Sequence, residues 1–269
     1  MGKKIYYYIY SPCGNDTALV EGTRSSRKEK KMINDAIMER HSNVEQVGFV
    51  EKDGGCRLIM AGGEFCGNAT RCAAFYYLKG KSGEIDIEVS GTEHLIKAGI
   101  DKAENVWSHI PIYTGNDAVT FMEQGIYQIK MDGITHIIVD ENISGEYLEI
   151  PENIKENALK VINRYEIDET EAIGVMFLEK VNQGFKIHPV VWVKSIDTTF
   201  YETACGSGSV AVGILKSIQN KFGQSLELLQ PSGQFIRTEI IMEKEKLISA
   251  SISGIVFWDE IRRTIEMSI

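Results

Sequence analysis

We expect this chain to adopt an α+β fold in which short strands and a few helices form two halves of similar order. Short runs of β-branched and aromatic residues, bounded by Gly- and Asp-containing turns, recur along most of the sequence. Two segments, Phe65–Thr70 and Ala204–Ser209, each place a cysteine beside glycine and small polar residues, just before a stretch with helical spacing. The order of strands around the first segment recurs around the second, about half a chain length later. These observations indicate an internal duplication.

The first half is predicted to span residues 1–113. Its strands are runs of β-branched and aromatic residues that end at turns such as Ser11–Asp16 and Lys52–Gly55. The basic cluster Arg24–Lys31 is interpreted as the solvated start of a helix, because apolar residues continue it at helical spacing. The predicted elements are strands Lys4–Tyr10 and Thr17–Val20, helix Lys28–Met38, strands Val47–Glu51 and Arg57–Met60, helix Arg71–Leu78, and strands Ile85–Val89, Leu95–Ala98 and Val106–Ile112.

The second half is predicted to span residues 114–258, and the last residues, about 259–269, are candidates to complete the first half. Ligand sites are frequent at such domain junctions, so we expect the active site in a cleft between the halves. The predicted elements are strands Ile126–Met131 and Thr135–Val139, helix Ile154–Tyr165, strands Gly174–Glu179 and Lys186–Val193, helix Val210–Ile218, and strands Glu227–Leu229, Phe235–Ile241 and Ile255–Trp258.

Composition limits the classes of function. The 269 residues are 43% hydrophobic and 25% charged, which is typical of a soluble globular protein. A formal net charge of −9 argues against a nucleic-acid binder. The N-terminal apolar run, Ile5–Tyr10, is too short and aromatic for a signal peptide, and none approaches the ~20 residues of a membrane helix. We therefore expect a cytoplasmic protein without nucleic-acid or membrane partners, in which thiols are reduced.

Cys66 and Cys205 are the candidate catalytic residues, because each directly precedes glycine at a predicted helix start. The positive end of a helix dipole lowers a cysteine pKa from about 8.5 toward neutrality. Two such thiols across a cleft form an acid–base pair that can move a proton on carbon. The substrate carboxylate would bind the free backbone N–H groups at the same helix starts, which belong to Gly67, Asn68, Gly206 and Ser207. We interpret the other cysteines as structural, namely Cys13, Cys56 and Cys72.

Four motifs resemble the diaminopimelate epimerase superfamily of cofactor-independent amino-acid racemases, over nearly the whole chain. They are Cys13–Asp16, Cys66–Asn68, Ala204–Gly208 and Gln230–Gly233. The resemblance implies two pseudo-symmetric domains, each a strand-rich, barrel-like sheet around a central helix. It also implies that one cysteine removes the α-proton as a thiolate while the other delivers a proton to the opposite face as a thiol. No cofactor is expected, and no His, Cys or Asp cluster has the spacing of metal ligands.

Other segments distinguish branches of this superfamily. The residues that bind the distal end of diaminopimelate are missing, whereas Glu45–Phe49 and Gly63–Thr70 look like the histidine racemases of bacterial metallophore biosynthesis. Four further residues are candidate substrate-binding groups. Glu45 would accept a hydrogen bond from an imidazole or ammonium, Glu202 would orient the ammonium or tune Cys205, His136 aligns with a family histidine, and Asn15 lies in the turn after the first strand.

The best hypothesis from the sequence is therefore an amino-acid racemase with L-histidine and D-histidine as its substrates. A diaminopimelate or other diamino-acid epimerase is the alternative within the same class. The second alternative belongs to another class. It is a thiol redox-regulated binding protein in which Cys66 and Cys205 form a regulatory disulfide. The expected partner is a small amino acid, and a homodimer is a candidate assembly.

Overall fold

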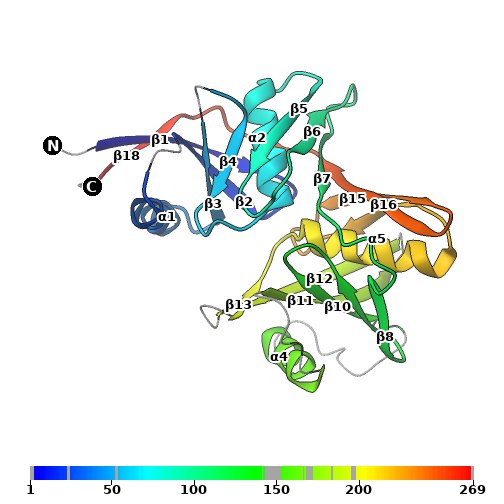
Figure 1. Ribbon diagram of the computed structural model, residues 1–269. Coiled ribbons are helices and arrows are strands. Elements are labelled where there is room, and N and C mark those ends of the chain that lie inside the picture. Colours follow the sequence, from blue (N-terminus) through cyan, green and yellow to red (C-terminus); the bar gives the residue numbers. More distant parts are fainter. Residues whose placement is uncertain are drawn as a thin grey trace. The chain divides into compact units, whose positions relative to one another are not determined.

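The computed structural model describes residues 3–22, 25–51, 54–140, 142, 153–165, 167, 172–182, 184–194 and 198–267. The chain folds into two compact units (Figure 1). One unit contains Met1–His109 and Ser253–Ile269, and the other contains Ile110–Ile252. Strands predominate over helices in both units, and the predicted sheet-rich α+β class is confirmed.

The first unit is built on a mixed sheet. β1 pairs with β2 and β18, β2 is parallel to β3, β3 is antiparallel to β4, and β4 is parallel to β5. The antiparallel pairs β5–β6 and β6–β7 continue it. These strands are β1 (Lys3–Ser11), β2 (Asp16–Glu21), β3 (Val44–Val50), β4 (Arg57–Met60), β5 (Gly83–Val89), β6 (Ile96–Ile100), β7 (Val106–Ile110), β17 (Phe257–Trp258) and β18 (Arg263–Met267).

Two helices cover this sheet. α1 (Arg27–Arg40) begins at Ser26, whose side chain forms a capping box with Glu29. It buries Ile33 and Ile37 against β1, β2 and β3, so the cluster from Arg27 onward forms the start of a helix, as predicted, while Arg24 lies outside the described residues. α2 (Gly67–Leu78) packs against β2, β5 and β6 (Figure 1) and has every residue of its first two turns buried. It is therefore the central helix of this unit.

The second unit repeats this plan with helices α4 (Ile154–Tyr165) and α5 (Gly206–Asn220). One face of the sheet packs on the apolar side of α4, and α5 contacts β8, β9, β10, β11, β14 and β15. Its strands are β8 (Val119–Glu123), β9 (Ile126–Lys130), β10 (Thr135–Asp140), β11 (Ala172–Val181), β12 (Gly184–Val193), β13 (Thr198–Tyr201), β14 (Ser225–Leu229), β15 (Phe235–Glu243) and β16 (Lys246–Gly254).

The strand directions of the two units correspond. In the first, β2–β3 is parallel, β3–β4 antiparallel, β4–β5 parallel and β5–β6 antiparallel. In the second, β10–β11, β11–β12, β12–β14 and β14–β15 have the same sequence of directions. α1 and α4 connect the first parallel pair of each unit, and α2 and α5 precede the last strand of the second pair. The recurring order that the sequence predicts is therefore present in the strand pairing.

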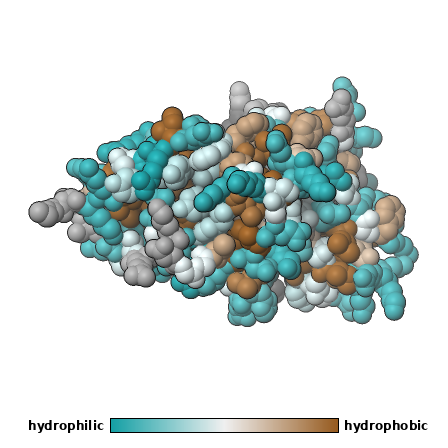
Figure 2. All heavy atoms as spheres, turned by 90° about the horizontal axis from the view of Figure 1, so that it is seen from above, coloured by the Kyte–Doolittle hydropathy of each residue, from teal (hydrophilic) through white to brown (hydrophobic). Residues whose placement is uncertain are grey.

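The sequence analysis missed four strands, β8, β13, β16 and β18. Polar or mixed residues dominate several of them, as in the segment Lys246–Gly254, so their β-structure depends on pairing with neighbours rather than on a local pattern. The predicted helices after Cys66 and Cys205 also begin four residues too late, because Gly and Asn are poor helix formers inside a helix but are acceptable in its first turn. Among the residues described, no helix has the length and apolar character that a membrane crossing requires. Figure 2 shows hydrophobic patches separated by hydrophilic residues on the face in view.

Candidate active site

Cys66 is the N-cap of α2, with extended backbone angles of φ −138° and ψ 116°. Its Sγ accepts a hydrogen bond from the backbone N–H of Ala69 at 3.4 Å. Its carbonyl accepts two more from Thr70, one from the backbone N–H at 2.9 Å and one from the hydroxyl at 2.7 Å. The thiol therefore takes the position that a Ser or Asp side chain occupies in an ordinary helix cap.

Cys205 caps α5 in the same way, with φ −126° and ψ 111°. Its Sγ accepts from the N–H of Gly208 at 3.3 Å, and its carbonyl accepts from the N–H and the hydroxyl of Ser209 at 3.0 and 2.6 Å. Both helices also end at a lysine in the left-handed conformation, Lys79 and Lys221. The prediction that each cysteine lies at a helix N-terminus is confirmed, and the duplication extends to individual hydrogen bonds.

The first N–H groups of each helix point away from its own carbonyls. In an α-helix these groups have no intrahelical partner, and they carry the positive end of the dipole. The four groups are those that the sequence predicts, from Gly67, Asn68, Gly206 and Ser207. Of these residues only Ser207 is partly exposed, and its hydroxyl lies 3.6 Å from the Sγ of Cys205. Each helix start can therefore bind a carboxylate or stabilise negative charge on one.

Arg71 is a buried residue of the first unit that the sequence analysis missed. Its side chain is fully buried, and its partners within the described part of the chain are carbonyls, an amide oxygen and a thiol rather than a carboxylate. It donates to the carbonyls of Val106, Pro12 and Ile255 at 2.8, 3.4 and 3.4 Å and to the Oδ1 of Asn68 at 3.4 Å. Arg71 therefore ties the first turn of α2 to the loop after β1. An arginine in an otherwise apolar stretch of helix was the signal available.

That loop carries Asn15, one of the predicted substrate-binding residues. Asn15 is buried, has a positive φ of 56°, and donates from Nδ2 to the Oε2 of Glu45 at 3.2 Å. Gln46 donates to the Oδ1 of Asn15 and, at 2.8 Å, to the hydroxyl of Thr17. The structure thus brings Asn15 and Glu45 together in one hydrogen-bonded network.

Gln230 holds the backbone of Cys205 in the second unit. Its side chain is fully buried, and its Oε1 accepts from the backbone N–H of Cys205 at 3.0 Å. Its Nε2 donates to the hydroxyl of Ser209 at 3.1 Å and to the carbonyl of Leu228 at 3.0 Å. The motif Gln230–Gly233 was recognisable in the sequence, but its contact with the cysteine cap required the fold.

The pKa of Cys205 differs from the sequence-based expectation. Burial raises it well above the usual value, and the carboxylate of Glu202 raises it further, by charge and by hydrogen bonding. The hydroxyl of Ser207 and the N–H of Gly208 oppose this change without reversing it. The predicted lowering is therefore wrong for Cys205, because desolvation outweighs the effect of the helix N-terminus. Glu202 lies beside Cys205, as its predicted tuning role requires.

His136 lies in the interior of the second unit on β10. Among the residues that the structure describes, neither ring nitrogen has a hydrogen-bond partner, and burial lowers the pKa of His136 to about 3, so the ring is neutral. It is opposite Gly174 on β11, where an added Cβ would lie 2.2 Å from Nδ1. The Sδ of Met176 in turn packs against Gly208 in the first turn of α5. His136 is therefore close to the Cys205 turn, but its role toward substrate stays a prediction.

The remaining cysteines have structural surroundings. Cys13 and Cys72 are buried, and Cys56 packs against the core of the first unit. The Sγ of Cys13 donates to the carbonyl of Ile255 at 3.3 Å, and none of the five cysteines forms a disulfide. Within the described ranges, no group of three or more His, Cys, Asp or Glu side chains is arranged to hold a metal ion.

Comparison with solved structures places the fold. A phenazine biosynthesis protein of the PhzF family from Enterococcus faecalis aligns with 98% of this chain and all of its own, with a TM-score of 0.64 and 15% identity. A hydroxyproline epimerase from Agrobacterium vitis, solved with trans-4-hydroxy-L-proline, aligns over 98% of this chain and 92% of its own, with a TM-score of 0.64 and 14% identity. These proteins share the fold of this chain.

Sequence comparison is more specific. Histidine racemases are 30% identical in Fusobacterium nucleatum, over 88% of this chain and 89% of the relative, and 25% identical in Staphylococcus aureus, over 87% and 88%. The fold and these relatives define the chain as an isomerase, an amino-acid racemase. A family model described as the histidine racemase CntK N-terminal domain matches residues 4–258, and the chain belongs to this family.

Proposed function

We propose that this racemase interconverts L-histidine and D-histidine without a cofactor, and that Cys66 and Cys205 are its acid–base pair. The observation that carries the proposal is the duplicated cap, in which each thiol accepts an N–H hydrogen bond at the start of a buried central helix. Inversion at carbon needs a base and an acid on opposite faces, and a duplicated fold can supply two equivalent groups. The histidine racemases among its relatives support the choice of substrate.

In the proposed reaction the substrate carboxylate binds the N–H groups of the two helix starts. A cysteine thiolate removes the α-proton, so the C–H electron pair stays on the substrate and delocalises into the carboxylate. The other cysteine then gives its S–H proton to the opposite face, and a new C–H bond forms. The helix N-termini stabilise the negative charge that develops between these steps. Each turnover exchanges the protonation states of the two thiols.

We further propose that Cys205 is the protonated partner at rest and that Cys66 is the thiolate. Burial and Glu202 both favour the neutral form of Cys205. Cys66 is less buried than Cys205, so desolvation penalises its thiolate less, which supports this assignment.

The specificity for histidine is assigned to the network of Asn15 and Glu45. An imidazole N–H can donate to a carboxylate oxygen, and the hydrogen bond from Asn15 fixes the orientation of Glu45. A buried polar group discriminates against substrates that leave it unpaired. On the Cys205 side, we propose that Glu202 orients the substrate ammonium group and that His136 contributes by packing. We propose no nucleic-acid or membrane partner, a cytoplasmic location and a homodimer.

The test is a survey of single amino acids in deuterated water without added cofactor. We expect deuterium at the α-carbon, measured by mass spectrometry, and D-histidine formed from L-histidine, measured by chiral chromatography. Exchange confined to diaminopimelate would contradict histidine as the substrate and favour the diamino-acid alternative. No exchange with any amino acid would contradict the proposed thiol chemistry and favour a redox-regulated binding protein.

A further inference from the structure

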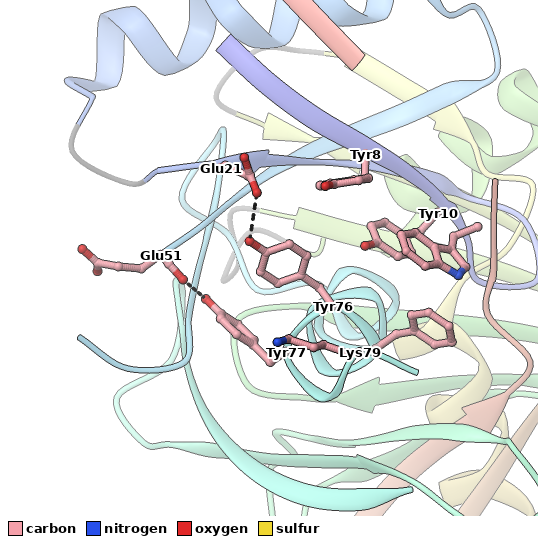
Figure 3. Close-up of a pocket in the computed structure, with 9 residues that line it drawn as sticks. Tyr8, Tyr10, Glu21, Glu51, Tyr76, Tyr77 and Lys79 are labelled. Carbon is pink, nitrogen blue, oxygen red and sulfur yellow. Dashed lines mark hydrogen bonds between the residues drawn. The ribbon is translucent and has the colours of Figure 1, made fainter. Parts of the chain in front are cut away.

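The first unit has a pocket at the end of α2 opposite to Cys66. It encloses about 450 Å³ (Figure 3). Since α2 has 12 residues, its two ends are separated by roughly 18 Å of helix. The pocket is therefore distinct from the cysteine cap, and the proposed reaction does not use it. It is lined by Tyr8, Tyr10, Glu21, Glu51, Phe75, Tyr76, Tyr77, Lys79 and Trp258.

Aromatic rings form most of its wall. The rings of Tyr10 and Trp258 are stacked, with centroids 5.9 Å apart and planes at 2°. Phe75 meets Trp258 edge-on at 5.8 Å, and Tyr8 lies 5.9 Å from Trp258 and 6.3 Å from Tyr76. The face of an aromatic ring is negative, so rings gathered around one space attract a cation placed within about 6 Å of their centroids.

Acceptor groups add to this negative wall. Glu21 accepts a hydrogen bond from the hydroxyl of Tyr76 at 3.4 Å, and Figure 3 shows the hydroxyl ends of Tyr8 and Tyr10 on the same side of the pocket. The last turn of α2, which supplies Tyr76, carries the negative end of the helix dipole. Lys79 is the positive group at the rim, and its exposed side chain lies in solvent.

Outside the pocket, Glu21 already forms a salt bridge with one organic cation of the chain itself, Arg262. Arg262 donates from Nε to Glu21 at 3.2 Å, and its guanidinium lies 3.9 Å from the centroid of the Tyr6 ring. Ring face and carboxylate thus act together just outside the pocket. Inside it, burial is the first cause of the raised pKa of Tyr10 and of Tyr76, and Glu21 is the next cause for Tyr76. Burial disfavours any charge, so only the contribution of Glu21 favours a cation.

We propose that this pocket binds a small organic cation with an alkylated ammonium head, held by the rings of Tyr8, Tyr10, Tyr76 and Trp258 and by the charge of Glu21. The C–H groups of such a head carry partial positive charge and can contact the ring faces. Its desolvation on binding costs less free energy than that of a primary ammonium group. A metal ion is a poor fit, because the lining has only two carboxylates, Glu21 and Glu51, and Figure 3 shows the carboxylate of Glu51 directed away from the tyrosines. This pocket would be an effector or second-ligand site, separate from the residues that carry out the proposed reaction.

The test compares choline with 3,3-dimethylbutan-1-ol, which has the same shape without the charge. Binding to the full chain is followed by tryptophan fluorescence and by isothermal titration calorimetry. We expect saturable quenching with choline and binding at least about tenfold weaker for the neutral alcohol, since cation–π contacts account for most of the attraction. Equal binding of the two probes would overturn the proposal.

Two variants and a matched control locate the site. Trp258→Leu removes a ring, and Glu21→Gln removes the charge while it retains an acceptor for Tyr76. Each should weaken choline binding about tenfold or more in calorimetry. Trp107→Leu is the control, because Trp107 is also a half-buried tryptophan of the first unit but lies on β7 outside the pocket. Thermal unfolding of each variant establishes that it is folded.

Three outcomes would contradict the inference. Choline binding that survives both pocket variants would place the cation elsewhere. Tighter binding of 3,3-dimethylbutanoate than of choline would show that Lys79 makes this an anion site. Fluorescence quenching that increases with protein concentration without choline, together with self-association in sedimentation experiments, would show that a second copy of the chain occupies the pocket. Loss of choline binding in both variants, with Trp107→Leu unchanged, would support the proposal whether or not histidine is the substrate.

Discussion

Replacing Gln230 with methionine tests how strongly the second unit depends on the hydrogen bonds behind Cys205. Methionine has nearly the volume of glutamine but no donor or acceptor of comparable strength. The change leaves the buried N–H of Cys205 and the carbonyl of Leu228 without the partners they have at 3.0 Å. The carbonyl of Cys205 keeps its bonds from Ser209, so the helix cap is weakened rather than removed.

The magnitude follows from these two groups. Each buried polar group left unpaired costs about 1–3 kcal/mol, and the apolar side chain offsets a part, which gives a loss of about 2–4 kcal/mol. For a unit of this size, that loss corresponds to a fall in Tm of roughly 5–10 °C. Displacement of the thiol also predicts a loss in kcat of roughly 10- to 100-fold, because catalysis depends on sub-ångström placement of the acid.

Differential scanning calorimetry and racemisation kinetics measure the two effects. Gln224→Met is the matched control, because within the described part of the chain the Nε2 of Gln224 is buried without a partner and its Oε1 accepts a 3.3 Å hydrogen bond from Asn220. This control should unfold within about 2 °C of the unmodified protein, or above it. A Gln230→Met protein with unchanged Tm and unchanged kcat would refute the role of Gln230.

Three other substitutions have defined outcomes. Glu202→Gln removes a charge that raises the pKa of Cys205, so in the direction that uses Cys205 as the acid, the loss of activity at high pH should move to lower pH; a pH–rate profile that stays in place or moves higher contradicts this. His136→Leu should raise Tm, because two buried nitrogens that are unpaired among the described residues disappear. It should also reduce the loss of stability as pH falls below about 6.5, because the imidazole takes up a proton in the unfolded chain and not in the folded one. A lower Tm at neutral pH would show that the ring is satisfied. Arg71→Lys keeps the charge but cannot reach four acceptors at once, so calorimetry should detect a lower Tm and kinetics a higher KM; wild-type values for both would exclude Arg71 as a positioning residue.

Local patterns were sufficient to predict most of the fold. The runs of β-branched and aromatic residues that form β1, β10 and β12, and the apolar spacing of α1 and α4, are visible in the sequence because they are local patterns of buried residues. Strands such as β16 and β18 were not predictable, since pairing with distant strands stabilises them more than their own residues do. The topology had to come from the duplication and the family resemblance.

The candidate site was predictable only in part. A Cys-Gly pair before a helical stretch was enough to place Cys66 and Cys205 at N-caps, because capping is a local property. Contacts made through the fold were not visible, and these include Arg71 with the loop after β1 and Gln230 with Cys205. The raised pKa of Cys205 was missed for the same reason, because burial is a tertiary property.

The most direct test of the two-thiol account is the position of the label at low conversion of L-histidine in deuterated water. If two different thiols face the α-carbon, the D-histidine formed carries solvent deuterium, while the recovered L-histidine remains unlabelled. Cys66→Ser and Cys205→Ser should each abolish racemisation without unfolding the protein. Deuterium in both enantiomers from the start would contradict the account and indicate a single base, as would racemisation at the native rate in both serine variants.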